Sequence, residues 1–164
     1  MKVRFAPSPT GHLHIGNFRT ALVNFLFARK NNGHFMLRID DTDQERSFIE
    51  YENAIKEDLS WMNIGWDSLE KQSSRLSCYD NALQILLNKK RAYPCFETAD
   101  ELSLKRKSQL SSGKPPIYDR SSLKLSDSEI ADLKSKGKKP HYRFLLNHVD
   151  VIWDDLVKGK SKYN

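Results

Sequence analysis

The sequence predicts an α/β protein that contains one half of a parallel sheet, followed by a smaller α+β region. Two observations carry this prediction. The first 40 residues follow the strand, helix and strand order of a parallel βαβ unit, and the composition changes near residue 97. The length of 164 residues is enough for a buried core, and 38% hydrophobic with 29% charged residues indicates a globular rather than a disordered chain.

The βαβ unit is read from periodicity and from residues that interrupt it. A strand is expected at 3–6, where Pro7 and Pro9 end it. A helix is expected at 16–30, because apolar residues recur at three- and four-residue steps until an Asn-Asn-Gly sequence closes the pattern. A second strand is expected at 35–39.

Further elements follow in the same way. Helices are expected at 48–62 and 76–90, each with an apolar stripe that should face the core, and a third strand at 93–96. Residues 98–139 are rich in Ser and Lys and poor in large apolar side chains, so we place a domain boundary near residue 97. The later elements expected are helices at 99–110 and 126–136 and strands at 141–146 and 149–153.

Charge and composition limit the classes of function. The net charge is +6, of which +2 lies in residues 1–96 and +4 in residues 97–164. This balance suits a polyanionic partner, although a merely solvated surface has the same charge, and no basic run is long or interleaved with aromatic residues. No stretch approaches the roughly 20 apolar residues of a membrane span, and the N-terminus lacks an apolar signal region, so we expect a cytoplasmic protein without membrane contact. Cys78 and Cys95 are expected to be free thiols.

The most informative segment is residues 4–17, RFAPSPTGHLHIGN, between the first strand and the first helix. In a parallel sheet, ligands bind where a strand's carboxyl end faces a helix N-terminus. Unsatisfied backbone N–H groups at Gly16 and Asn17 and the helix dipole are expected to attract an anion there. His14 adds a donor, and Gly16 leaves room for a flat group to pack on the backbone.

Two clusters of charge accompany this segment. Arg4 ends a strand expected to be buried, where a cation needs an anionic partner, and its guanidinium suits a carboxylate of a ligand or of an internal salt bridge. Residues 38–43, RIDDTD, place three carboxylates after the second strand. They could bind a divalent metal, cap the next helix or hold an ammonium group, and Thr42 and Asp43 are expected to be caps.

The strings at 4–17, 19–22 (RTAL) and 38–43 together resemble the class I aminoacyl-tRNA synthetases, and among them the bacterial glutamyl members. Asn17 stands where several class I members have a second histidine. The resemblance implies a Rossmann-type catalytic domain whose N-terminal half is residues 1–97, with residues 98–164 forming part of an inserted, tRNA acceptor-binding domain. The chain would then be truncated within that insert, and apolar surface is expected where the other half would pack.

The activity implied by the resemblance is that of an ATP-dependent glutamate–tRNA ligase. Such an enzyme uses ATP with Mg²⁺ to activate glutamate and transfers it to the 3′ end of tRNA(Glu), and the parent enzyme is expected to be a monomer. The family's Lys-Met-Ser-Lys-Ser type loop does not occur in residues 1–164, so this fragment alone is expected to be inactive. Two alternatives remain: a glutamyl-queuosine tRNA synthetase, and a non-catalytic tRNA-binding module.

The resemblance also assigns residues. His14 and Gly16 would be catalytic, and Asp40 would face the ammonium group of glutamate. The residues implied in ATP binding are Thr10, Gly11, His14, Gly16 and Asn17. Those implied in glutamate binding are Arg4, Ala6, Ser8 and Asp40. The motif itself comprises Pro7, Ser8, Pro9, Thr10, Gly11, His12, Leu13, His14, Ile15, Gly16 and Asn17.

Two later features are less decisive. Some family members bind zinc through a Cys-x-Cys pair and two later ligands, but here Glu97 occupies the place of the second cysteine, and no cysteine occurs after Cys95. Because a structural zinc needs about four ligands, we expect no metal. Residues 153–157, WDDLV, are similar to a stretch of the acceptor-binding domain, and either ligand contact or packing in a hairpin would explain Trp153.

Overall fold

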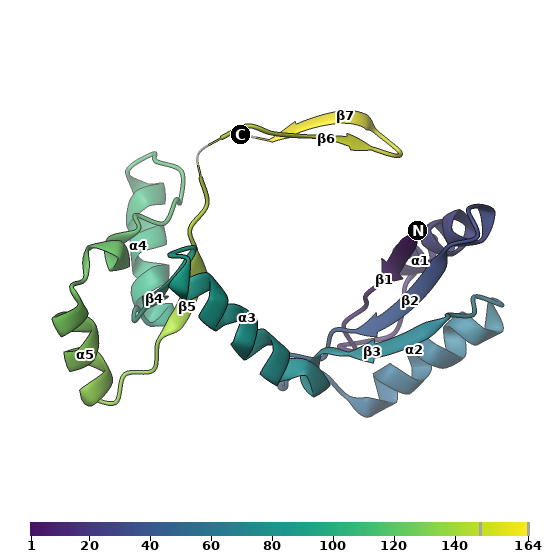
Figure 1. The fold of residues 1–164 in the computed structure, drawn as a ribbon, viewed down its shortest axis with the longest axis horizontal. Helices are drawn as coiled ribbons and strands as arrows, with labels where there is room; N and C mark the ends of the chain where they lie inside the picture. Colours follow the sequence, from purple (N-terminus) through teal and green to yellow (C-terminus); the bar gives the residue numbers. More distant parts are fainter. Residues whose placement is uncertain (148, 164) are drawn as a thin grey trace. The chain divides into compact units, whose positions relative to one another are not determined.

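The computed structural model describes residues 1–147 and 149–163, which divide into two compact units, Met1–Asp80 and Asn81–Asn164 (Figure 1). The first unit holds a three-stranded parallel sheet in the order β1-β2-β3, so the α/β prediction is confirmed. Its elements are β1 (Lys2–Phe5), α1 (Ile15–Lys30), β2 (His34–Ile39), α2 (Ile49–Trp61), β3 (Ser68–Lys71) and the 3₁₀ helix η1 (Gln72–Arg75), and the boundary between the units falls within α3 (Leu76–Asn88).

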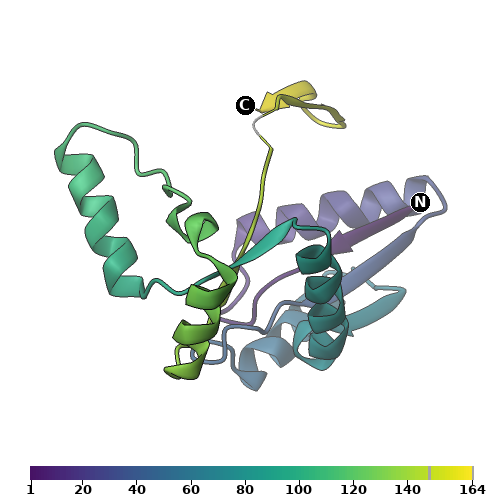
Figure 2. The same cartoon turned by 60° about the vertical axis from the view of Figure 1, so that its left-hand side comes forward.

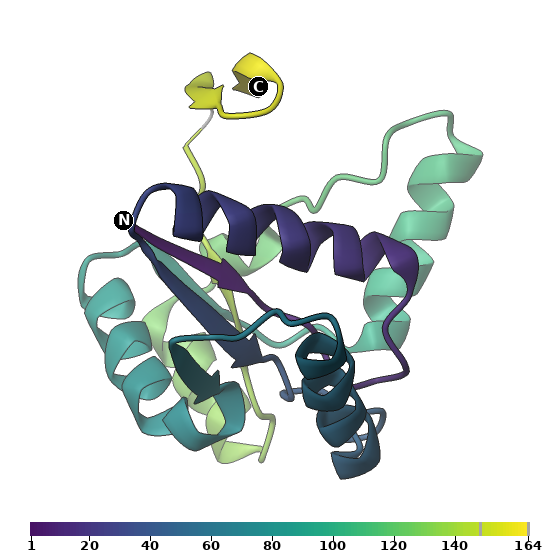
Figure 3. The same ribbon diagram turned by 90° about the vertical axis from the view of Figure 1, so that its right-hand side faces the viewer.

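The core of the first unit lies on one face of this sheet. Side chains alternate along a strand, so Phe35, Leu37 and Ile39 of β2 share a face, and all three are buried. The same cluster includes Ala21 and Ala28 of α1 together with Ile55 and Leu59 of α2. Both helices therefore pack on that face, and Figure 3 shows α1 lying across β1 and β2. The outer side of α1 leaves Leu22, Val23 and Leu26 exposed.

Three elements of the first 97 residues differ from expectation. The third strand of the parallel sheet is β3, which the sequence does not predict because its four residues, SLEK, are mostly polar. The strand expected at 93–96 exists as β4 (Ala92–Cys95), but it pairs antiparallel with β5 (His141–Phe144). No residue of α3 is buried, so the expectation that its stripe faces a core is wrong; Leu83, Leu86 and Leu87 are only half-buried.

The second unit is α+β (Figure 2). Besides β4 and β5 it contains α4 (Ala99–Ser111), the 3₁₀ helix η2 (Ser121–Lys124), α5 (Asp127–Ser135), and the hairpin of β6 (Val151–Asp155) with β7 (Gly159–Tyr163). Thr98 and Ser126 begin α4 and α5 as N-caps, each in a reciprocal capping box with a glutamate three residues later. Trp153 stacks on Tyr163 across the hairpin, with ring centroids 5.3 Å apart. None of the helices described is long and apolar enough to cross a membrane.

Candidate active site

A cavity of about 380 Å³ opens where β1 ends and α1 begins. It is lined by Ala6, Pro7, Ser8, Thr10, Gly11, His12, Leu13, His14 and Asn17. Its volume lies in the range of about 300–1,000 Å³ typical of small-molecule sites. The structure thus brings most of the predicted motif around one cavity, and the predicted residues outside its lining are Arg4, Pro9, Ile15, Gly16 and Asp40.

Backbone hydrogen bonds hold the proline-rich loop against the residue after β2 and the start of α2. The Pro7 carbonyl accepts from the Asp40 N–H at 2.9 Å, and the Pro9 carbonyl accepts from the Phe48 N–H at 3.1 Å. Pro9 is fully buried, and the Thr10 N–H donates to the Ser8 carbonyl at 2.9 Å to close the turn. Two sequence segments that were predicted separately therefore meet, and both prolines contribute carbonyl acceptors as well as stiffness.

His14 begins α1 as its N-cap. Its Nδ1 accepts a hydrogen bond from the Gly16 N–H at 3.1 Å, and the Asn17 side-chain oxygen accepts from the His14 N–H at 3.2 Å. Because Nδ1 is an acceptor, the proton of the neutral imidazole is on Nε2, which can donate to a ligand. This reciprocal cap gives Asn17 a structural role that sequence reasoning missed, although an N-cap followed by an amide three residues later is a recognisable signal.

The expectation that the Gly16 and Asn17 N–H groups are unsatisfied is wrong. Gly16 donates to the His14 ring, and the Asn17 N–H donates to the His14 carbonyl at 2.9 Å. The cap occupies these donors, so attraction of an anion rests on the helix dipole and on side-chain donors. Gly16 also leaves room for the capping ring, because a Cβ there would lie 2.8 Å from Cε1 of His14 and the ring would have to shift.

Arg4 is exposed, so the expectation that it is a buried cation is wrong. Side chains alternate along β1, and Phe5 takes the face that points into the core while Arg4 points to the other face. Strand β1 is also an edge of the sheet, paired only with β2 in the part of the chain described. Because Arg4 is exposed to solvent, it does not need an anionic partner within the protein, and its guanidinium is free to bind an anionic ligand.

Asp40 forms an ion pair with Arg38, and both side chains are about a quarter exposed. The Asp40 backbone N–H donates to the Pro7 carbonyl, and this bond fixes the position of Asp40 beside the cavity. The hydrogen bond to Asp40 raises the pKa of Arg38, against a smaller opposing effect of burial.

Thr42 and Asp43 are not helix caps, contrary to expectation. Helix α2 has Phe48 as its N-cap, without a side-chain hydrogen bond, and Asp43 instead pairs with Arg46 in the turn between β2 and α2. Because a turn separates β2 from α2, the helix begins only at Ile49, and the carboxylates at 40–43 lie too far from its first turn to cap it.

A buried carboxylate that the sequence does not indicate fixes the loop after β2. Glu52 of α2 is buried and accepts from Lys56 and Lys71, each at 2.7 Å. Lys71 also lies 3.6 Å from Asp41, which accepts from the Ser73 N–H at 2.9 Å. Burial raises the pKa of Glu52 and Asp41, but these hydrogen bonds and the Lys71 charge outweigh it and leave both below their ordinary values.

One set of side chains in the second unit has donors close enough to consider a metal. Atoms of Cys95, Glu97 and His141 lie within 4.8 Å of one another. Of these, Glu97 is already hydrogen-bonded by hydroxyl groups of Tyr118, Ser121 and Ser122. Cys78 and Cys95 are both free thiols, as expected.

Known proteins that resemble this chain are class I tRNA synthetases. A family model described as tRNA synthetases class I (E and Q), catalytic domain, matches residues 1–164. Glutamate–tRNA ligase 1 of Rickettsia rickettsii is 58% identical over 161 residues, and that of Rickettsia felis 57%; each alignment covers 98% of this chain and 36% of the relative. The chain therefore spans about a third of the length of these relatives.

Solved structures give the same result. The crystal structure of a glutamate tRNA ligase from Elizabethkingia meningosepticum in complex with its amino acid has a TM-score of 0.89 and 33% identity, covering 99% of this chain and 36% of that chain. A glutamate–tRNA synthetase from Elizabethkingia anophelis gives the same values. By the motif, the fold and these comparisons, the chain belongs to the catalytic-domain family of the class I tRNA synthetases for glutamate and glutamine.

Proposed function

We propose that this chain forms the glutamate- and ATP-binding half of the catalytic domain of a glutamate–tRNA ligase. The observation that carries the proposal is the cavity at the end of β1, lined by the proline-rich loop, His14 and Asn17 and joined to Asp40 through the Pro7 carbonyl. The reaction is activation of glutamate with ATP to glutamyl-adenylate, followed by transfer to the 3′ end of tRNA(Glu).

Glutamate would be oriented by one cation and one anion. Arg4 is exposed at the end of β1 and offers a two-pronged donor for the side-chain carboxylate, with the Ser8 hydroxyl on the cavity wall as a second partner and Ala6 beside it. Asp40 retains acceptor capacity beyond its bond to Arg38, because each carboxylate oxygen accepts more than one hydrogen bond, and would face the α-ammonium group.

ATP would lie along the N-terminus of α1. The Nε2–H of His14 and the side-chain amide of Asn17 would donate to phosphate oxygens, and Thr10 and Gly11, which also line the cavity, would contact the nucleotide. The α-carboxylate of glutamate is ionised at pH 7, so in-line attack on the α-phosphorus needs no general base. Catalysis then rests on positioning and on stabilising charge at the phosphate, and Mg²⁺ arrives bound to ATP as a further source of positive charge.

The rest of the domain organisation is also a proposal. Residues 1–97 would be the N-terminal half of a Rossmann-type domain, and residues 98–164 part of an inserted domain that binds the tRNA acceptor end. The exposed Leu22, Val23 and Leu26 on α1 support a further covering of that helix, because a helix that is apolar on its outer side is normally buried. The net charge of +4 in residues 97–164 suits a polyanion.

The test is acceptance of labelled glutamate by tRNA(Glu) with the protein that carries this chain. We expect a charged product that disappears when the 3′ terminal adenosine is removed from the tRNA. Labelling that survives this removal would instead identify a ligase that loads an internal base. Binding of tRNA without any charging, unchanged in His14→Ala, would identify a non-catalytic binding module.

A further inference from the structure

We propose that a metal-independent hydrogen-bond cluster around Glu97 holds the second unit together where some synthetases of this family use zinc. The Glu97 cluster consists of Cys95, Glu97, Tyr118, Ser121 and Ser122. Oε1 of Glu97 accepts from the Tyr118 hydroxyl at 2.6 Å and from Ser121 at 2.9 Å, and Oε2 accepts from Ser122 at 2.8 Å. The Tyr118 hydroxyl also lies 3.7 Å from Cys95 Sγ.

The donor set does not fit a structural zinc. Such a site takes about four ligands, mostly thiolates and imidazoles, whereas here the donors with the required spacing are one thiol, one imidazole and one carboxylate in the described part of the chain. The carboxylate is already satisfied by three hydroxyl groups, and a metal would have to displace them.

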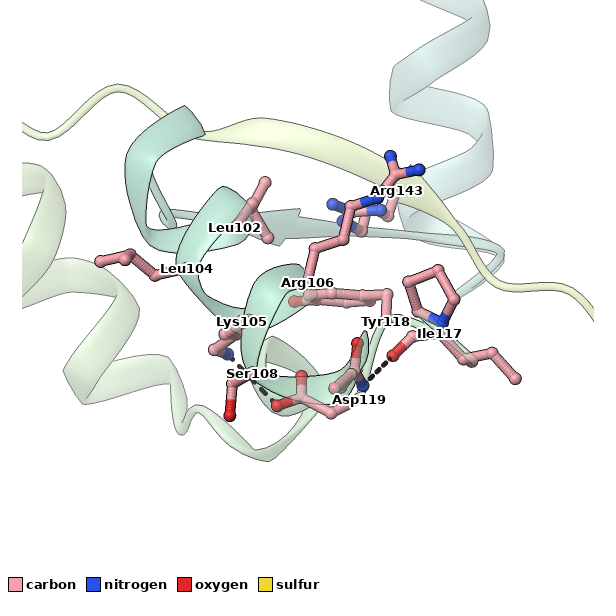
Figure 4. A pocket seen from close by; sticks show the side chains of 11 residues that line it. Leu102, Leu104, Lys105, Arg106, Ser108, Ile117, Tyr118, Asp119 and Arg143 are labelled. Carbon is pink, nitrogen blue, oxygen red and sulfur yellow. Dashed lines mark hydrogen bonds and ion pairs between the residues drawn. The ribbon is translucent and has the colours of Figure 1, made fainter. Parts of the chain in front are cut away.

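The surrounding charge also disfavours a divalent cation. Lys105 Nζ lies 3.9 Å from Glu97 Oε1, and the Arg143 guanidinium lies 3.9 Å from the centroid of the Tyr118 ring. Figure 4 shows the side chains of Lys105 and Arg143 near the segment that follows α4, which contains Tyr118 and Asp119. Lys105 also pairs with Asp119. The carboxylates of Glu97 and Asp119 share Lys105, and the Arg143 charge lies over the Tyr118 ring, so the negative charge that would attract a divalent cation is already compensated by side-chain cations.

The Glu97 cluster joins segments that are distant in the sequence. It ties the residues after β4 to Tyr118 in the loop after α4 and to the start of η2, which lie 21 to 25 residues further along the chain. Cys95 and Ser122 are buried at its centre. A hydrogen bond to a charged group in such a site contributes more than one between neutral groups, which is how the cluster can replace a metal crosslink.

Metal content is the first measurement. We expect the purified chain to hold fewer than about 0.1 zinc atoms per chain after expression in zinc-supplemented medium, and EDTA to leave its thermal midpoint unchanged. Stoichiometric zinc, or a midpoint that falls with EDTA, would overturn the proposal.

Stability variants are the second measurement. Tyr118→Phe is expected to raise the unfolding equilibrium constant by about tenfold, and Glu97→Gln by at least as much. The matched controls are Tyr163→Phe and Asp154→Asn, whose side chains are exposed in the terminal hairpin and should change it less than about twofold. If Tyr118→Phe behaves like Tyr163→Phe, the Glu97 cluster does not hold the unit and the proposal fails.

A double variant distinguishes loss of the hydrogen bond between Glu97 and Tyr118 from a general loss of packing. Glu97→Gln together with Tyr118→Phe should be less destabilising than the product of the two single effects, because both remove the same 2.6 Å hydrogen bond. Independent effects would contradict the proposed cluster. Should Glu97→Gln fail to fold, the metal measurement and Tyr118→Phe still decide the question.

Discussion

Arg38 and Asp40, two residues apart at the end of β2, form a two-pronged ion pair. Nε of Arg38 donates to Oδ1 of Asp40 at 2.6 Å, and the terminal nitrogen Nη2 donates to Oδ2 at 2.8 Å. The Asp40 backbone N–H at the same time donates to the Pro7 carbonyl of the cavity loop. Arg38 therefore fixes the orientation of a carboxylate whose backbone is already attached to the proposed glutamate site.

This pair predicts that Arg38→Gln raises the KM for glutamate about tenfold in ATP–pyrophosphate exchange, with a smaller change in kcat. Without its partner the Asp40 side chain gains rotamer freedom and meets the ammonium group less often. The measurement uses the protein that carries this chain. The control is Arg29→Gln, which breaks the 3.0 Å ion pair with Asp67 elsewhere in the same unit. Equal KM values in the two variants would show that Arg38 has no positioning role.

Gly16→Ala is predicted to displace the His14 ring, since the added Cβ would lie 2.8 Å from Cε1 and 3.0 Å from Nδ1. Loss of the N-cap should destabilise the unit by about 1 kcal/mol, measured by denaturant unfolding. Imidazole ¹⁵N spectra should show His14 protonated on Nε2 alone in the parent chain and a mixture of tautomers in the variant.

Gly65→Ala is the matched control for this change, because a Cβ at Gly65 meets nothing within 4 Å and the position lies outside the cavity. It should leave both the unfolding free energy and the His14 spectrum near those of the parent. A Gly16→Ala variant with an unchanged His14 tautomer would contradict the capped geometry.

The Glu97 cluster predicts a defined dependence of stability on pH. Burial raises the pKa of Glu97, but the hydrogen bonds from Tyr118 and the serines outweigh it and lower the pKa from 4.5 to about 2. A carboxyl group whose pKa is lowered by folding stabilises the native state at pH values above the pKa that it has in the unfolded chain. That stabilisation, about 3 kcal/mol, should be lost as the pH falls from about 4.5 to 2.

The measurement is the difference in unfolding free energy between the parent chain and Glu97→Gln across this interval. It should shrink towards zero at the acid end, while carboxylates common to both proteins, such as Asp41 and Glu52, cancel. A constant difference between pH 5 and 2 would mean that Glu97 is not held ionised by its neighbours.

The contribution of Tyr118 to stability is expected to change at alkaline pH. Burial, and then the bond to Glu97, raises its pKa to about 12. A hydroxyl group whose pKa is raised by folding stabilises the native state at pH values below 10, its ordinary pKa. This stabilisation is lost as the pH rises from 10 towards 12. The stability difference between the parent chain and Tyr118→Phe should therefore decrease between pH 10 and 12, as followed by urea unfolding.

Local patterns predicted the first βαβ unit well. Strands β1 and β2 and helix α1 begin and end within about two residues of expectation, because Pro7, Pro9 and the residues before Gly33 mark the ends of apolar runs. The motif around His14 likewise assembled as one cavity wall. In these places the signal is contained in neighbouring residues.

Features made by pairing across the chain were not predictable in this way. Strand β3 owes its extended form to β2 rather than to its polar sequence, and Glu52 meets Lys71 only after α2 folds onto the sheet. The exposure of Arg4 is not predictable from the sequence, because the residues at the end of a strand do not reveal which face of the sheet is covered. The Glu97 cluster depends on contacts more than 20 residues apart, for which one sequence offers no signal.

The most direct test of the proposed function is glutamate-dependent ATP–pyrophosphate exchange by the protein that carries this chain, compared with its His14→Ala variant. We predict exchange that requires glutamate and falls by about 100-fold or more when the Nε2–H donor at the start of α1 is removed. Residues 1–164 alone should show none. Exchange that is unaffected by His14→Ala, or that proceeds with another amino acid in place of glutamate, would contradict the proposed function.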